Sequence, residues 1–187
     1  MAELKQFSAK PEIQEALARE ASLLAEMRAV AVAPVSQDGA RKLMGLSEGV
    51  LQAAHKVTQL LEAESGSKTG RLVNIAGRQR MLSQRLAKFY MLKKWGFNQP
   101  EIASGIEQAR KEFATAMQEL VAAPQNTAEI KEELEQARVQ WGFFEIALER
   151  QDDGDNAKSV TNVATTSERI LETMNTVTAL YEKVEGR

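Results

Sequence analysis

The chain has 187 residues, enough for one sizeable core or for one and a half small modules. A hydrophobic content of 43% and a charged content of 27% are ordinary for a globular protein, and four prolines with 5% aromatic residues disfavour a β-sandwich. The lack of cysteine excludes disulfides and thiolate metal sites, and no apolar run approaches the ~20 residues of a transmembrane helix.

Apolar residues recur with helical spacing along almost the whole chain, and no segment shows the period of a strand. We predict an all-α fold, with Thr127 as one N-cap, a turn or helix break over residues 65–70 and a polar loop over residues 151–155. Pro11 and Pro100 mark helix starts. The predicted helices are Glu12–Ala33, Gly39–Glu64, Arg71–Trp95, Pro100–Ala123, Ala128–Arg150 and Asn156–Val184.

The chain also repeats itself. Residues 12–17 resemble residues 129–134 at an offset of 117, and after a longer loop in the second copy the offset becomes 120. The later matches include Ser47 with Ser167, and Thr58 with Thr178. We therefore predict a helical hairpin over residues 1–66, which is the second half of a truncated first repeat, followed by a complete antiparallel four-helix bundle over residues 71–187.

Charge is distributed unevenly along the chain. Residues 65–100 contain no acidic residue, whereas the rest of the chain has 16 bases against 26 acids and a net charge of −10. A helix this basic inside an acidic protein indicates a partner or a bound anion. The basic residues of this segment are Lys68, Arg71, Arg78, Arg80, Arg85, Lys88, Lys93 and Lys94.

At about 100° per residue, the basic helix has one face suited to the core and a second face suited to another helix. The expected core stripe contains Ile75, Leu82, Leu86 and Phe89. The roughly opposite face, with Asn74 at its edge, contains Val73, Gly77, Arg80, Met81, Gln84, Lys88 and Met91. A glycine in mid-helix costs about 1 kcal/mol against alanine, so Gly77 suggests the close approach of a second helix. On a two-fold axis, two Arg80 side chains would repel unless a small planar anion lay between them.

Other interpretations of these residues are open. The arginines can be solvated or paired with acids of neighbouring helices, and a basic helix can bind nucleic acid, although here the bases surround the helix instead of lining one face. One histidine and no cysteine provide no nucleophile–base pair, so we expect no enzyme. Glu132, Glu133 and Glu135 do not converge, so neither a metal site nor a cofactor is expected.

The segment Leu72–Lys88 resembles the signature of PilJ-type domains, the N-terminal sensory domains of type IV pili methyl-accepting chemotaxis transducers. It is similar, more loosely, to the P-box of NarX-like nitrate and nitrite sensor kinases, which lacks the equivalents of Arg78 and Gln79. The resemblance implies an all-α bundle that dimerises through this helix, with nitrate at the interface.

By position, the resemblance implies anion contacts from Gly77 and Arg80, with less defined roles for Arg85, Arg78, Asn74 and Ser83. The homodimer contacts expected from the helical wheel are Gly77, Met81, Gln84 and Lys88.

The resemblance implies a sensory module for nitrate, nitrite or a similar small anion, read by a downstream signalling protein. The alternative is a helical dimerisation module with no small ligand. In the family the motif helix follows a transmembrane segment, whereas here it follows a helical hairpin, which disfavours piston signalling. The expected location is the periplasm in the parent protein, with the cytoplasm as the alternative.

Overall fold

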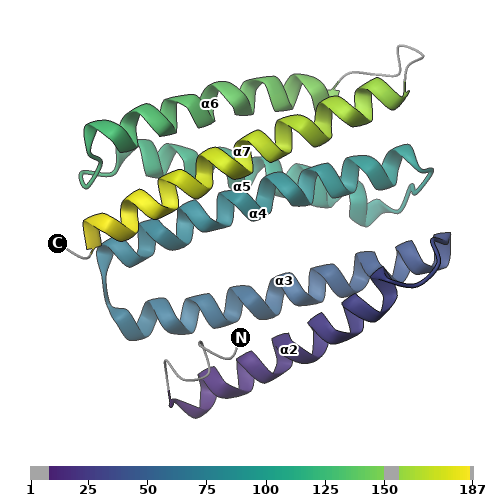
Figure 1. Cartoon of the computed structure of the whole chain (residues 1–187), viewed down its shortest axis with the longest axis horizontal. Coiled ribbons are helices and arrows are strands. Elements are labelled where there is room, and N and C mark those ends of the chain that lie inside the picture. Colours follow the sequence, from purple (N-terminus) through teal and green to yellow (C-terminus); the bar gives the residue numbers. More distant parts are fainter. Residues whose placement is uncertain (1–8, 150–155, 186–187) are drawn as a thin grey trace. The chain divides into compact units, whose positions relative to one another are not determined.

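The computed structural model describes residues 9–149 and 156–185, and these ranges contain six α-helices and no β-strand (Figure 1). The prediction of an all-α fold is confirmed. The predicted polar loop over residues 151–155 lies outside the described residues. The helices are α2 (Pro11–Ala31), α3 (Gln37–Ser65), α4 (Lys68–Lys94), α5 (Pro100–Ala122), α6 (Ala128–Glu149) and α7 (Asn156–Glu185).

The helix boundaries follow from local capping. Ser36 and Ser67 accept backbone N–H bonds three residues on, at 3.0 Å each, and Thr127 accepts the N–H of Ile130 at 3.2 Å. The expected N-cap at Thr127 is confirmed. The predicted turn or helix break over residues 65–70 is present but shorter, because Ser67 caps α4 and the helix begins at Lys68. Gly66 ends α3 at a φ of 63°, in the left-handed region that glycine tolerates.

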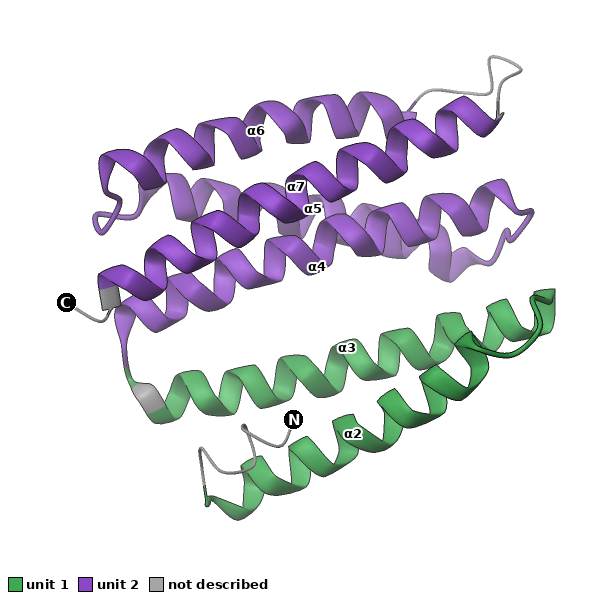
Figure 2. Cartoon of the chain, in the orientation of Figure 1, with its two compact units in different colours: residues 1–66 green, residues 67–187 purple. Residues whose placement is uncertain are grey.

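The chain divides into two compact units, residues 1–66 and residues 67–187 (Figure 2). The second unit is a bundle of α4, α5, α6 and α7, whose successive helices run antiparallel (Figure 1). Helix α4 packs against both α5 and α7, and α6 packs against α7. The largest fully buried side chains of this unit are Tyr181, Phe113, Phe144, Leu82, Leu86, Leu120, Ile130, Leu134, Ile170 and Met174.

Aromatic side chains fill the space between α5 and α6. The Phe113 and Trp141 rings stack with centroids 3.8 Å apart and planes 10° apart, and the Trp141 centroid lies 5.8 Å from that of Phe144. Trp141 and Phe144 are therefore core residues, as their helical spacing predicted. At the surface, Arg110 on α5 bonds to Glu145 at 3.2 Å and to a second acid of α6.

The first unit is the α2–α3 hairpin, and its small core contains Ile13, Leu17 and Val57. Positions that the repeat aligns make the same local hydrogen bonds. The Ser47 and Ser167 hydroxyls each donate to the carbonyl three residues earlier, at 2.9 and 2.8 Å. The Thr58 and Thr178 hydroxyls donate to the carbonyl four residues earlier, at 2.9 and 2.7 Å. The α2–α3 and α6–α7 hairpins thus share their local construction.

The turn between α5 and α6 is tied to α7 by hydrogen bonds. The Asn126 side-chain amide donates to the Leu120 carbonyl at 2.7 Å, and the Tyr181 hydroxyl donates to Asn126 Oδ1 at 2.6 Å. The Tyr181 side chain is fully buried, and this burial raises the pKa of its hydroxyl to about 12.

We expect Gly105→Ala to destabilise the bundle. A Cβ at position 105 would lie 2.6 Å from Cε2 of Phe89, a ring that is only 2% exposed. Displacing such a ring should lower the free energy of unfolding by about 1–3 kcal/mol, measured in urea. The control is Gly142→Ala within α6, where a Cβ would meet nothing within 4 Å and stability should rise by about 0.5–1 kcal/mol. Equal effects of the two variants would contradict the close helix approach.

Stability should fall between pH 10 and 12 partly because of Tyr181. The unfolded chain releases this proton near its ordinary pKa of 10.0, whereas the folded chain holds it to about 12. The unfolded state therefore binds fewer protons in this window, so the free energy of unfolding declines as the pH rises. In Tyr181→Phe the decline should be shallower, and below pH 10 the variant should be less stable by about 1 kcal/mol. Parallel pH profiles of variant and parent chain in urea titrations would refute this role.

Candidate functional site

The face of α4 that helical spacing predicted as a second interface is only half-buried. Val73, Gly77, Arg80, Met81 and Gln84 each have intermediate exposure. The buried face is wider than the predicted stripe, because α4 contacts α5 on one side and α7 on the other. The half-buried strip borders these contacts, since Val73 and Met81 pack against the edge of the core and Arg80 reaches α7. It is polar enough to stay in contact with water and apolar enough to accept a second helix.

Gly77 and Arg80 lie together on this strip, one turn apart. A Cβ built on Gly77 would meet Nη2 of Arg80 at 3.6 Å, so the guanidinium lies back over the glycine. Its Nη1 donates to Oδ1 of Asn175 on α7 at 2.5 Å. Asn175 has no motif around it and is exposed on α7, so nothing in the sequence marks it as a site residue. The structure thus groups Gly77, Arg80 and Asn175.

The other predicted anion contacts point elsewhere. Nη2 of Arg78 donates to Glu112 on α5 at 2.6 Å, and the Arg85 guanidinium lies 5.1 Å from the centroid of the Phe89 ring. Ser83 is fully buried and donates to the carbonyl of Arg80 at 2.9 Å. Asn74 is half-buried on the turn before Gly77. In this structure Arg78, Arg85 and Ser83 therefore do not join the Arg80 guanidinium in one cluster.

The predicted dimer contacts lie on the same half-buried strip, which we call the outer strip of α4. Met81 packs against the core from its edge, and Nζ of Lys88 lies 4.7 Å from the centroid of the Phe89 ring. Nε2 of Gln84 is buried and has no hydrogen-bond partner among the described residues. An unpaired buried donor costs free energy, so the Gln84 amide is a group that a partner could satisfy.

The Gln79 side chain lies in the interior of the bundle and not on the outer strip. It is fully buried, and its Nε2 donates to the carbonyl of Phe113 on α5 at 2.9 Å. Its Oε1 is also buried and has no partner in the described part of the chain. Gln79, one of the two residues that depart from the NarX-type pattern, therefore forms a polar connection between α4 and α5.

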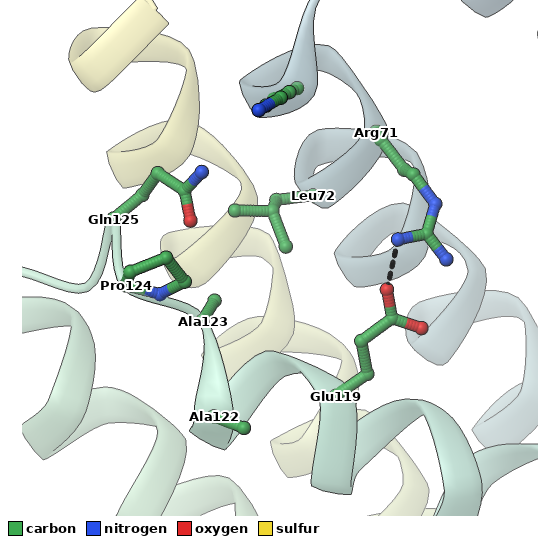
Figure 3. Close-up of a pocket in the computed structure, with 8 residues that line it drawn as sticks. Arg71, Leu72, Glu119, Ala122, Ala123, Pro124 and Gln125 are labelled. Carbon is green, nitrogen blue, oxygen red and sulfur yellow. Dashed lines mark ion pairs between the residues drawn. The ribbon is translucent and has the colours of Figure 1, made fainter.

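A separate cavity of about 430 Å³ lies at the amino end of α4 (Figure 3). Arg71 and Glu119 form an ion pair along one side of it, and Gln125 lies across from them with Leu72 between. None of its lining residues belongs to the Arg80 cluster. They are Lys68, Arg71, Leu72, Glu119, Ala122, Ala123, Pro124 and Gln125.

Residues 9–149 and 156–185 hold neither a candidate metal site nor a candidate membrane span. Within these ranges no three histidine, cysteine, aspartate or glutamate side chains gather in a way that could hold a metal ion. No helix there has the length and hydropathy required to cross a membrane.

Comparison with known proteins gives one family. The family described as "Type IV pili methyl-accepting chemotaxis transducer N-term" (PilJ) matches residues 61–163, more than half of the chain. No curated protein and no solved structure matches the chain. The matched range contains the whole of α4, α5 and α6 and begins near the end of α3. The chain therefore belongs to the PilJ family of chemotaxis transducer sensory domains, as the motif Leu72–Lys88 had indicated.

Proposed function

We propose that this chain is a sensory module that binds nitrate or nitrite at a homodimer interface formed by the outer strip of α4. The observation that carries the proposal is the position of the Arg80 guanidinium, which lies over Gly77 and donates to Asn175. One guanidinium is thereby held on the half-buried strip. A guanidinium that is held in one orientation is well suited to a planar oxyanion.

A two-fold axis near Gly77 would complete the site. The glycine presents backbone and no side chain, so the two copies of α4 could approach closely there. Two Arg80 guanidiniums would then face each other, and their repulsion would grow as water is excluded. An anion between them would replace this repulsion with charge-assisted hydrogen bonds from both copies. Binding and dimerisation would therefore favour each other.

Asn175 suggests how the anion is sensed. The side chain links the Arg80 guanidinium to α7, the last helix of the bundle. An anion that competes with Oδ1 of Asn175 for the guanidinium would weaken the hydrogen bond between α4 and α7. It would also bias the angle or offset of the paired α4 helices, because it binds one arrangement better than the other. A downstream signalling protein would respond to this change. As part of the same proposal we assign the domain to the periplasm.

A dimerisation module with no small ligand is the second candidate. In its favour, Arg80 already has a hydrogen-bond partner in Asn175, and the buried Nε2 of Gln84 has none among the described residues. In this version α4 pairs with a second copy to satisfy Gln84, and the arginine supports the bundle. Thermal melts with a panel of small anions distinguish the candidates, since the second predicts a dimer that no anion stabilises.

Arg80→Ala should abolish nitrate-dependent thermal stabilisation. For the parent chain, nitrate at 100 times its Kd should stabilise the fold by about 2.7 kcal/mol relative to chloride at equal ionic strength. Arg71→Ala is the matched control, because it removes an arginine of the same helix whose partner is Glu119 and leaves Arg80 in place. Equal nitrate affinity of Arg80→Ala and the parent chain by calorimetry would disprove the anion site.

Gly77→Ala should separate folding from dimerisation. Within one copy the new methyl would make only ordinary contact with Arg80, at 3.6 Å, so the helix should gain up to about 1 kcal/mol of stability. The methyl groups would keep two α4 helices from approaching closely at this position. The dimer should therefore be weaker and dissociate at a higher protein concentration in analytical ultracentrifugation.

The control for this experiment is Gly45→Ala in α3, where a Cβ would meet nothing within 4 Å. It should raise helix stability and leave dimerisation unchanged. A Gly77→Ala dimer as tight as that of Gly45→Ala would place the dimer interface away from Gly77.

A further inference from the structure

Helix α6 carries apolar residues on two faces. Its inner face is buried through Ile130, Leu134, Ala137, Trp141 and Phe144. On its outer face Val139 is 49% exposed, Phe143 is 64% exposed and Ile146 is 54% exposed. Spacings of four and three residues place these side chains in one stripe. Gly142 lies in the same stripe, and a Cβ there would meet nothing within 4 Å, so the backbone is uncovered.

The internal repeat shows that the hairpin does not need this stripe. At the offset of 117, Val139, Phe143 and Ile146 align with Ser22, Glu26 and Ala29 of α2. These three residues are exposed too, and they are polar or small. The same helical position is therefore compatible with an ordinary solvated surface. An apolar stripe that packing does not require indicates a binding face.

The charges beside the stripe restrict the partner. Arg138, Glu145 and Glu149 fall on one flank of the stripe at about 100° per residue. Arg110 donates to Glu145 at 3.2 Å and to Glu149 at 2.6 Å, so two carboxylates share one guanidinium. Arg138 bonds only to Glu135 in the interactions described, at 2.8 and 2.5 Å, and its side chain is 62% exposed. The flank is thus basic at one end and acidic at the other.

We propose that the outer stripe of α6 binds the same stripe of a second copy in an antiparallel pair. An axis between Gly142 and Phe143 places Val139 of each copy opposite Ile146 of the other and packs each Phe143 ring over the bare backbone of the other Gly142. In this arrangement the same flanks meet in opposite directions, so Arg138 lies between Glu145 and Glu149 of the second copy. In a parallel pair the two-fold axis would run along the helices, so the flank with Arg138 would face the opposite flank of the second copy. That flank holds Gln136, Gln140 and Ala147 and offers no charge to pair with.

The pair uses no residue of α4, so it does not depend on the anion site. Its apolar area comes from three side chains, well under the roughly 800 Å² per partner of a standard interface, so we expect weak and reversible association. With a second isologous face on α4, such pairing would connect dimers into larger assemblies.

Cysteine cross-linking of the full chain tests the pair, because the parent sequence has no cysteine and hence no background. Gly142→Cys should form a disulfide dimer with itself. Val139→Cys mixed with Ile146→Cys should cross-link more than either variant alone. Lys111→Cys, at an exposed position of α5, gives the level of random collision. Cross-linking of Gly142→Cys no greater than that of Lys111→Cys would overturn the proposal, as would Val139→Cys dimers that exceed the mixed product.

A triple variant that copies α2 provides the second measurement. Val139→Ser, Phe143→Glu and Ile146→Ala should together preserve the helical circular dichroism, because α2 already carries these residues at aligned positions. In a Gly142→Cys background the variant should lose the disulfide dimer at least tenfold while the nitrate response is unchanged. Retained cross-linking would exclude the stripe as the contact. A lost nitrate response with retained cross-linking would count against the independence of the two faces and against this pair.

Discussion

Helix α4 contacts two neighbours at once, and this constraint decides where each of its cationic side chains can go. Toward α5, Arg71 and Arg78 meet Glu119 and Glu112. Toward α7, Arg80 meets a neutral amide oxygen, that of Asn175. Arginines of one helix therefore have different electrostatic surroundings. The charges of Arg71 and Arg78 are offset by carboxylates of the bundle, whereas the described partner of Arg80 is neutral. That difference makes Arg80 the side chain best suited to an anion.

The motif also contains buried polar side chains at positions where apolar side chains would cost less free energy. Gln79 is fully buried, and its Oε1 has no hydrogen-bond partner among the described residues. Nε2 of Gln84, on the outer strip, is also a buried atom without a partner there. Each unpaired buried group costs roughly 1–3 kcal/mol. A helix selected only for stability would avoid both. Gln84 lies on the strip for which we propose a partner, and the Gln79 amide bonds to the Phe113 carbonyl and so fixes the register of α4 on α5.

The two hairpins illustrate how one local design serves different surfaces. The α2–α3 and α6–α7 hairpins share serine and threonine hydrogen bonds at aligned positions. Their outer faces differ, since α6 exposes Phe143 where α2 exposes Glu26. Inside the bundle, the stacked rings of Phe113 and Trp141 occupy the space between α5 and α6. The inner faces are constrained by packing, whereas the outer faces are free to vary.

The sequence by itself determined the helices, most of their ends and the family, because periodicity, caps such as Thr127 and the motif Leu72–Lys88 are local signals. It also placed Gly77 and Arg80 on one face, since helical spacing is fixed. Only the tertiary structure decided which arginine is compensated. Arg78 and Arg80 are two residues apart and indistinguishable by type, but one points to Glu112 on α5 and the other to Asn175 on α7. Those partners lie 34 and 95 residues away, and packing alone brings them together.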